Sequence, residues 1–297
     1  MANVLLSEAE KTFITHGVEE DFRVDGRSNI DYRPMELETG IVSHASGSAR
    51  LRLANTDILV GIKTEIDTPY QEKHDEGKIE FFIDCSANAT PEFEGRGGEE
   101  LALEISNTLQ KAYQSSKAFQ LKNLCILPRQ QCWKLYVDIL ILECGGNLFD
   151  AVSLAVKAAL FNTRVPKVQA ALMDGGTVDL TLSDDPYDCE RLQIDSVPLL
   201  VTICKIGEHC VVDPSAEEEA CSSASLVVGV SNHNGKCGIT NIRTNGAGSL
   251  HIDTVSRSIE LGISAGTCLD KELMRVLKVD ERLNSESTNK EVYGFLK

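Results

Sequence analysis

The sequence predicts an α+β fold built from two related halves, and three observations support this prediction. Strand-like runs of apolar residues recur along most of the 297 residues. Each half contains several such runs followed by a helical pattern, an order that favours α+β halves over a doubly wound parallel sheet. In addition, residues 133–161 join a strand directly to a helix through a glycine turn.

The segment 133–161 contains the clearest strand and helix of the chain. Both faces of residues 135–142 are mostly apolar, as in a central strand. Gly145-Gly146 then permits a tight turn. Asn147 is expected to cap the following helix, and Asp150 is the acidic residue expected in its first turn. Apolar and small residues continue at helical spacing: Ala151, Leu154, Ala155, Ala158 and Phe161.

This strand–glycine–helix junction is a candidate phosphate site, because free N–H groups and the helix dipole would both face the turn. A purely structural connection is the more common outcome for such a turn. The stretch has neither the lysine of a P-loop nor a G-x-G-x-x-G pattern, so it does not indicate an ATP or NAD site.

The composition is that of an ordinary soluble globular protein, with 42% hydrophobic and 25% charged residues. The length suits one large or two modest domains with an ample core. No apolar run approaches the roughly 20 residues of a membrane span. The first residues, MANVLLSEAEK, contain no basic region and no long apolar run, so no secretory signal is expected.

Charge and cysteine content narrow the class of protein further. The formal charge of −16 argues against nucleic-acid binding by the whole surface, and leaves room for a local basic patch or for basic partners. The ten cysteines include no C-x-x-C pair and several lie in apolar runs, so reduced thiols in a cytosolic or nuclear protein are expected. The six histidines are scattered, and no metal site is predicted.

A short helix and an arm are expected over residues 1–30. Ser7 to Glu10 forms a capping box, and Gly17 is expected to end the helix. The segment Arg23-Val-Asp-Gly-Arg27 is interpreted as a solvent-exposed charged loop. The first half of the fold is then expected over residues 31–187.

Strands are predicted between residues 35 and 63, where Gly47-Ser48-Ala49 separates two runs, and over residues 79–85. Arg50 and Arg52 fall on one face of the second run.

A flexible loop at 90–98 carries Arg96, and a helix is predicted to begin at Glu99, with Lys111 near its outer end. Two strands within 165–182 flank Asp174-Gly-Gly, which predicts a β-hairpin.

The second half is expected over residues 188–280, after a linker at 183–187. A long amphipathic helix is predicted from His251 to Lys278, followed by a loose polar tail over 281–297. The strands of this half are expected at 197–206, 210–213, 225–231 and 237–243.

Several motifs occur in the order found in proteins of the RNase PH fold: Arg23-Val-Asp-Gly-Arg27, Gly47-Ser-Ala49, Thr56-Asp57-Ile-Leu-Val60, the strand-Gly-Gly-helix centre, and Val212-Asp-Pro214 with Glu217-Glu-Glu219. The sequence resembles a ring subunit of the eukaryotic RNA exosome, on the branch related to the archaeal exosome's second, non-catalytic subunit. Segments 91–98 and 143–150 are similar to metazoan members of that branch. The resemblance implies an RNase PH fold, whose first half resembles domain 2 of ribosomal protein S5 and whose second half is smaller.

The catalysts of this family are phosphorolytic exoribonucleases, in which inorganic phosphate attacks the last phosphodiester at an RNA 3′ end and releases a nucleoside diphosphate. That chemistry needs basic or N–H groups for phosphate, and carboxylates for a metal or a proton. Active members carry a hydroxyl residue, often followed by arginine, where this chain has Asn147 and Leu148. Active members also have arginines near the end of the preceding helix, where this chain has Lys111 and Gln114. They have acidic residues leading into the strand that corresponds to segment 221–226, which contains none.

These departures imply a chain that does not catalyse and needs no cofactor. Asp213 and Glu217–Glu219 remain, but acidic residues in a turn are interpreted as solvated.

The resemblance also implies a structural role. Related RNase PH-like subunits pair head to tail, and three pairs close a ring around a channel, to which RNA-binding cap proteins and hydrolytic exoribonucleases attach. The chain is therefore expected to help form the channel that threads RNA for 3′-to-5′ degradation and processing, including rRNA maturation and mRNA turnover. The expected location is the nucleus, including the nucleolus, and the cytoplasm; no membrane partner is expected.

The candidate RNA-binding residues are basic side chains in loop, strand-face or helix-end positions: Arg96, Arg50, Arg52 and Lys111. Arg96 is hypothesised to reach the channel from its loop, and an arginine that only solubilises this loop is an equal alternative.

Two other functions stay open. One is an active phosphate-dependent 3′-to-5′ exoribonuclease of RNase PH type, in which the Gly145-Gly146-Asn147 turn holds phosphate through N–H groups alone. The other is a free-standing interaction module with no role in RNA metabolism.

Overall fold

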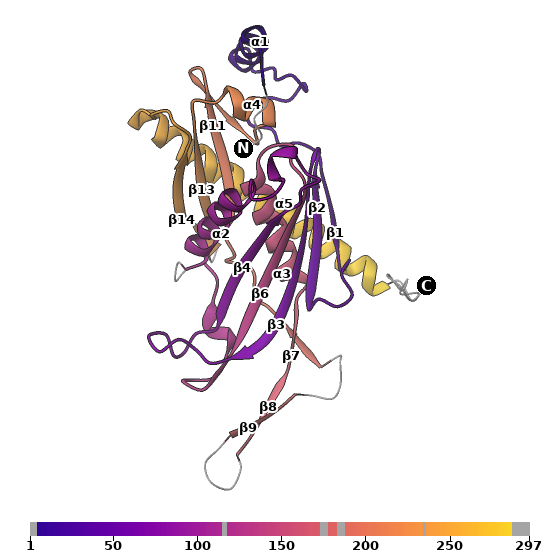
Figure 1. Ribbon diagram of the computed structural model, residues 1–297. Helices are drawn as coiled ribbons and strands as arrows, with labels where there is room; N and C mark the ends of the chain where they lie inside the picture. Colours follow the sequence, from indigo (N-terminus) through magenta and orange to yellow (C-terminus); the bar gives the residue numbers. More distant parts are fainter. Residues whose placement is uncertain (1–4, 115–117, 173–177, 183–187, 234–235, 287–297) are drawn as a thin grey trace.

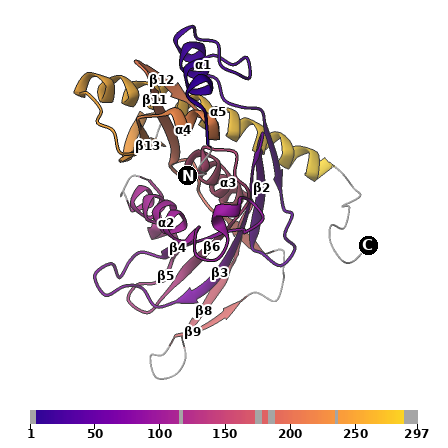
Figure 2. The same cartoon turned by 45° about the horizontal axis from the view of Figure 1, so that its top comes forward.

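The computed structural model describes residues 5–114, 118–172, 178–182, 188–233 and 236–286. Two β-sheets enclose the helices α2 (Glu99–Tyr113) and α3 (Leu148–Asn162), and α5 (Ile252–Glu286) covers the outer face of the second sheet (Figures 1 and 2). This layered arrangement confirms the predicted α+β class with two strand-and-helix halves. None of the helices in the described part of the chain combines the length and the apolar character that a bilayer-spanning segment requires.

The larger sheet has the strand order β1-β2-β3-β6-β4, and β5 pairs with β6. Its pairs are antiparallel except for β4 with β6, which is parallel. The strands are β1 Met35–Thr39, β2 Gly47–Leu53, β3 Thr56–Asp67, β4 Lys78–Cys85, β5 Cys125–Leu127 and β6 Gln131–Glu143.

Gly47-Ser48-Ala49 begins β2 and does not separate two runs, as the sequence had predicted. The end of α3 approaches the backbone here, so that a Cβ at Gly47 would lie 2.6 Å from the Cα of Thr163. The glycine is therefore explained by close packing between a strand and a helix.

Strand β6 lies inside the larger sheet, as predicted, with β3 and β4 on its two sides. Its inner face is buried in the core through Leu135, Val137, Ile139 and Ile141. The other face is less covered than its apolar pattern predicted, since Asp138 is exposed and Leu140 is only partly buried.

Helix α3 occupies the centre of the molecule. Every residue from Leu148 to Leu160 is buried, including Asp150 and Lys157. A helix with apolar residues all round is expected at such a position, between two packed layers. Helix α2 begins at Glu99, as predicted, and packs against β4 and β14.

The second sheet has the order β12-β11-β13-β14, and its strand pairs are antiparallel. A short helix, α4 (Ala216–Cys221), follows β12. The strands are β11 Leu199–Ile206, β12 His209–Val212, β13 Ala224–His233 and β14 Lys236–Asn245.

Helix α5 approaches the second sheet closely through two glycines. A Cβ at Gly262 would lie 3.1 Å from Ile203, and one at Gly266 would lie 3.0 Å from Val230. The helix continues to Glu286, beyond the predicted end at Lys278, so residues 281–286 are helical and not a loose tail.

Two short strand pairs complete the fold. β7 (Arg164–Pro166) pairs with β10 (Cys189–Arg191), and β8 (Val168–Leu172) pairs with β9 (Val178–Leu182). The strands β8 and β9 form the predicted hairpin and project from the body (Figure 1). Its turn at 173–177 and the predicted linker at 183–187 lie outside the described residues.

Helix α1 (Glu8–Glu19) begins with the predicted capping box of Ser7 and Glu10. It does not end at Gly17, as the sequence had suggested. A Cβ at Gly17 would lie 2.8 Å from the carbonyl oxygen of Phe22, so this glycine permits the returning chain to pass close to the helix.

Candidate functional site at the junction of the two halves

The turn between β6 and α3 is the predicted phosphate site, and two of its N–H groups already have protein acceptors. Gly145 donates its N–H to the Oγ1 of Thr56 at 3.2 Å, and Asn147 donates its N–H to the Oε1 of Glu219 at 2.8 Å. A carboxylate thus lies at the helix N-terminus, where it is favoured by the same dipole that would favour phosphate.

Asn147 does not cap α3 with its side chain, which corrects the sequence-based expectation. Its backbone is left-handed, with φ of 54°, a conformation that asparagine tolerates better than most residues. The side-chain Nδ2 donates to the Oδ1 of Asp213 at 2.7 Å. The Asn147 side chain therefore binds Asp213, from the second half, and does not cap the helix.

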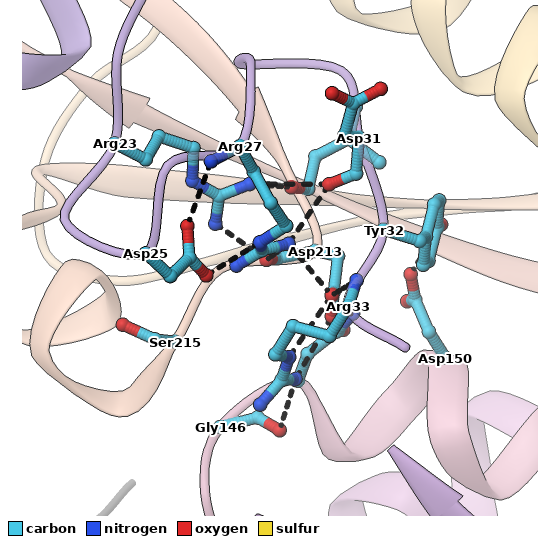
Figure 3. Close-up of polar contacts among 12 residues, drawn as sticks. Arg23, Asp25, Arg27, Asp31, Tyr32, Arg33, Gly146, Asp150, Asp213 and Ser215 are labelled. Atoms are coloured by element: carbon cyan, nitrogen blue, oxygen red, sulfur yellow. Dashed lines mark hydrogen bonds and ion pairs between the residues drawn. The ribbon is translucent and has the colours of Figure 1, made fainter. Parts of the chain in front are cut away.

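Asp213 is fully buried and bound by Arg33 through both side chain and backbone (Figure 3). The Nε and Nη2 of Arg33 donate to the two carboxylate oxygens at 3.0 and 2.9 Å, and its backbone N–H donates at 2.8 Å. Burial opposes ionisation, but the hydrogen bonds and charge of Arg33 hold the pKa of Asp213 below its ordinary value.

Arg33 also joins this carboxylate to the glycine turn. Its guanidinium donates to the carbonyl oxygens of Gly145 at 2.9 Å and Gly146 at 3.1 Å. One side chain from the segment just before β1 thus connects the turn before α3 with the end of β12.

Arg23 forms a second buried ion pair, with Glu218 of α4. Its Nε donates to the Oε1 of Glu218 at 2.8 Å, and its Nη2 donates to the carbonyl oxygen of Asp213 at 2.7 Å. Arg23 is 1% exposed and Glu218 is 4% exposed. The interpretation of 23–27 as an exposed charged loop is therefore wrong for Arg23, although residues 24–26 are exposed. The interpretation of the acidic residues as solvated is wrong for Asp213 and Glu218.

A third polar cluster surrounds Asp150, in the first turn of α3. Tyr32 donates its hydroxyl to one carboxylate oxygen at 2.8 Å, and Thr202 of β11 donates to the other at 2.7 Å. Burial raises the pKa of Asp150 to about 7, although these donors favour its charged form. This carboxyl therefore changes charge near neutral pH while connecting the arm, the central helix and the second sheet.

We expect Asp150→Asn to reduce the pH dependence of stability. Because the folded pKa of Asp150 is raised above 3.8 to about 7, its contribution favours folding most below about pH 4 and declines as the pH rises through 7. Asparagine keeps an oxygen acceptor but cannot ionise. Urea unfolding at about pH 5 and about pH 8 should show a smaller loss between the two pH values in the variant than in the unchanged chain. Equal losses in both proteins would contradict the raised pKa.

A cavity of about 170 Å³ lies beside the N-terminus of α3. It is bounded by α2, α3 and the second sheet, and its lining in the described chain contains Glu100, Glu104 and Glu219 but no Lys, Arg or His. Burial raises the pKa of Glu219, although the N–H of Asn147 lowers it. Ser225 of β13 faces the same cavity, at the strand where segment 221–226 lacks acidic residues.

The four predicted RNA-binding residues do not form one cluster. Arg50 and Arg52 lie side by side on β2, but both pair with Asp57: Arg50 through bonds of 3.0 and 2.6 Å, and Arg52 through one of 3.4 Å. The hydrogen bonds and charge of Arg50 lower the pKa of Asp57 although this carboxylate is buried. Part of the positive charge on this strand face is therefore neutralised within the chain.

Arg96 and Lys111 lie at opposite ends of α2. Arg96 precedes the helix, its side chain is 90% exposed, and it pairs with Glu99 at 3.7 Å. Lys111 is exposed in the last turn. The helix of 15 residues is about 22 Å long, so these two cations cannot bind the same phosphate.

A further contact between the halves was not predicted from the sequence. Arg243 of β14 donates to the Oγ1 of Thr108 at 2.8 Å and forms an ion pair with Glu104. These residues lie far apart in the chain and belong to no motif. Only the packing of α2 against β14 brings them together.

The sheets, the central helix and the junction define a protein of the RNase PH class. Residues 31–166 match the model of the 3′ exoribonuclease family, domain 1, and residues 196–265 match domain 2 of the same family. The chain belongs to this family, which confirms the resemblance seen in its sequence motifs.

Its relatives include exosome components. A Dictyostelium discoideum protein named exosome complex exonuclease RRP42 is 34% identical over 91% of this chain and 98% of its own length. Exosome complex component Rrp42 of Methanopyrus kandleri is 34% identical over 79% of this chain and 85% of its own length. A chain of the Archaeoglobus fulgidus exosome, solved with RNA bound to the active site, superimposes with a TM-score of 0.76 and 25% identity, covering 89% of this chain and 98% of that one.

Proposed function

We propose that this chain is a structural subunit of an exosome ring and helps to form a channel for RNA. The Rrp42 relatives from Dictyostelium discoideum and Methanopyrus kandleri match it over most of both lengths, and its fold matches a chain of an archaeal exosome. In this role it supports 3′-to-5′ degradation and processing of RNA, including rRNA maturation and mRNA turnover, without cleaving RNA itself.

The acidic cavity at the N-terminus of α3 is the observation that supports the absence of catalysis. Phosphorolysis places an inorganic phosphate dianion next to an RNA phosphodiester, and this accumulation of negative charge needs cations or free N–H donors. Here Glu219 already accepts the N–H of Asn147, and the cavity lining contains Glu100 and Glu104, of which Glu104 is paired with Arg243. A phosphate entering this space would meet the carboxylates of Glu100 and Glu219 and no cation of the described lining.

The same geometry disfavours a phosphate site made from backbone N–H groups alone. Thr56 accepts from Gly145, and Glu219 accepts from Asn147, so two donors of the turn are already used. Lys111 lies about 10 Å further along α2 than Glu104, the last α2 residue in the cavity lining, and does not supply the missing charge there.

We expect no release of nucleoside diphosphate when the purified chain is incubated with RNA, inorganic phosphate and Mg²⁺. The ring reconstituted with its RNase PH-like partners should assemble stably, and any release should be unaffected by Asn147→Ala in this chain. Release by the isolated chain that Asn147→Ala or Asp213→Ala abolishes would refute the non-catalytic proposal.

The proposed partners are other RNase PH-like ring subunits, RNA-binding cap proteins and hydrolytic exoribonucleases, together with RNA. The proposed locations are the nucleus, including the nucleolus, and the cytoplasm. Co-purification separates a ring subunit from a free-standing interaction module, because only the former should retain RNase PH-like neighbours.

Among the four candidate RNA-binding residues, Arg96 has the best geometry for contact with a passing strand. It is nearly fully exposed, and its pairing with Glu99 is long at 3.7 Å. Exposed ion pairs of this kind contribute little and break easily. Arg50 and Arg52 would have to leave Asp57, so their contribution to RNA binding should be smaller than that of Arg96.

We expect Arg96→Ala in the assembled ring to weaken RNA binding and to reduce the salt dependence of the affinity. Loss of one phosphate contact to single-stranded RNA should lower the slope of log affinity against log salt by about 0.7. Arg275→Ala is a matched control, because Arg275 is also exposed and pairs with an acidic residue three positions away. An unchanged slope and unchanged RNA protection in Arg96→Ala would exclude Arg96 from the RNA path.

A further inference from the structure

Two cysteines of the larger sheet lie directly opposite each other. Cys125 of β5 and Cys132 of β6 are register partners in an antiparallel strand pair. Directly opposed residues point to the same face of a sheet, with Cα atoms about 4.5–5.5 Å apart. Disulfides span Cα separations of about 4.4–6.8 Å, so this register is compatible with a bridge. The register shifts between Cys125 and Leu127, immediately beside the pair.

The two thiols differ in exposure. Cys132 is 0% exposed, whereas Cys125 is partly exposed and lines a groove of about 590 Å³. The same groove is lined by Phe119, Trp133 and Arg191. A small reagent can therefore reach Cys125 before the buried Cys132, and Cys132 would act as the resolving thiol.

We propose that Cys125 and Cys132 form a thiol–disulfide modification site for low-molecular-weight disulfides such as glutathione disulfide. The Cys125 thiolate attacks one sulfur of the reagent, forming a mixed disulfide and releasing one thiol. The Cys132 thiolate then attacks the sulfur of Cys125 and releases the second thiol. The protein dithiol is oxidised by two electrons, the reagent disulfide is reduced by two, and the two protein protons end on the released thiols.

The surroundings of both thiols keep the reaction slow at neutral pH. Burial and the charge of Asp75 raise the pKa of Cys125. Burial and Asp67 also raise the pKa of Cys132, while the ammonium groups of Lys78 and Lys134 act in the opposite direction. Since the thiolate is the attacking form, the dithiol persists in a reducing compartment and oxidises faster as the pH rises.

Oxidation would join β5 to β6 covalently and close the turn at 128–130. It would also fix the Cys125 side of the groove next to Trp133, the single tryptophan of the chain.

The positions of the basic residues make this bridge easy to detect after digestion. Trypsin cleaves after Lys122, Arg129 and Lys134, so the bridge would connect two separate peptides, 123–129 and 130–134.

The experiment treats the purified full chain with glutathione disulfide at a pH of about 8.5, near the ordinary thiol pKa. Remaining thiols are alkylated, the protein is digested with trypsin without reduction, and the peptides are analysed by mass spectrometry. We expect the linked pair 123–129 and 130–134, which disappears on prior reduction. Fluorescence of Trp133 should change on oxidation and return on reduction.

Three variants separate this site from other oxidation. Cys132→Ser should leave glutathione attached to Cys125, and Cys125→Ser should leave Cys132 as an alkylated thiol after unfolding. Cys85→Ser, which alters a partly buried cysteine elsewhere in the sheet, should leave the linked pair unchanged. A stable glutathione adduct on Cys125 in the unchanged chain, a bridge to a different cysteine, or no oxidation of either thiol would overturn the proposal.

Discussion

Replacing Arg33 by methionine is expected to lower the free energy of unfolding by about 3–5 kcal/mol, because it leaves the buried carboxylate of Asp213 without its main cation. Asp213 is 0% exposed and receives three hydrogen bonds from Arg33. The substitution removes the two side-chain bonds. It also removes the donors to the carbonyl oxygens of Gly145 and Gly146.

Thermal and urea unfolding of the full chain measure this loss, with Arg96→Met as the control for an exposed arginine. In the Arg33→Met variant, Arg27 is the remaining cation beside the Asp213 carboxylate, at 3.1 Å. Adding Asp213→Asn should recover part of the stability, because the incompletely paired buried charge is then removed. Lowering the pH should reduce the difference in free energy of unfolding between Arg33→Met and the unchanged chain. Protonation of Asp213 removes its negative charge, as Asp213→Asn does. A loss no larger than that of Arg96→Met would show that Arg33 does not stabilise the junction.

Gly146→Ala is expected to destabilise the chain by about 3 kcal/mol or more. Gly146 has a left-handed backbone with φ of 95°, and a Cβ there would lie 2.5 Å from the backbone N of Ala216. An alanine must therefore accept an unfavourable backbone conformation and also displace the start of α4. Since α4 carries Glu218 and Glu219, the buried ion pair with Arg23 and the bond to Asn147 would be disturbed together.

Gly95→Ala is the matched control. Gly95 also has a positive φ, of 69°, but a Cβ there would meet no atom within 4 Å. It should cost only about 1 kcal/mol, the price of the left-handed backbone alone. The difference between the two variants in urea unfolding isolates the close approach of Ala216. Equal costs would mean that α4 can move away from the turn without loss.

The sequence by itself determined the local elements of this protein. The alternation of Leu135, Val137, Ile139 and Ile141 predicted β6, and the glycine pair with the helical spacing after it predicted α3. Ser7 and Glu10 predicted the start of α1. These features depend on residues a few positions apart, for which backbone periodicity and capping chemistry are sufficient. The ordered motifs along the chain also indicated the family, which the family models confirm.

Only the tertiary structure decided which polar residues are buried and with which partners. Arg23 and Glu218 are 195 positions apart, and Arg33 and Asp213 are 180 apart. From the sequence, charged residues in a glycine-containing loop and in an acidic turn are expected to be solvated, because the sequence does not show which distant residue pairs with them. Asn147 likewise has the residue type and position of a helix cap, but in the structure its side chain binds Asp213. A buried charge is stable only when its counter-ion and hydrogen bonds surround it, and folding of the two halves against each other supplies both.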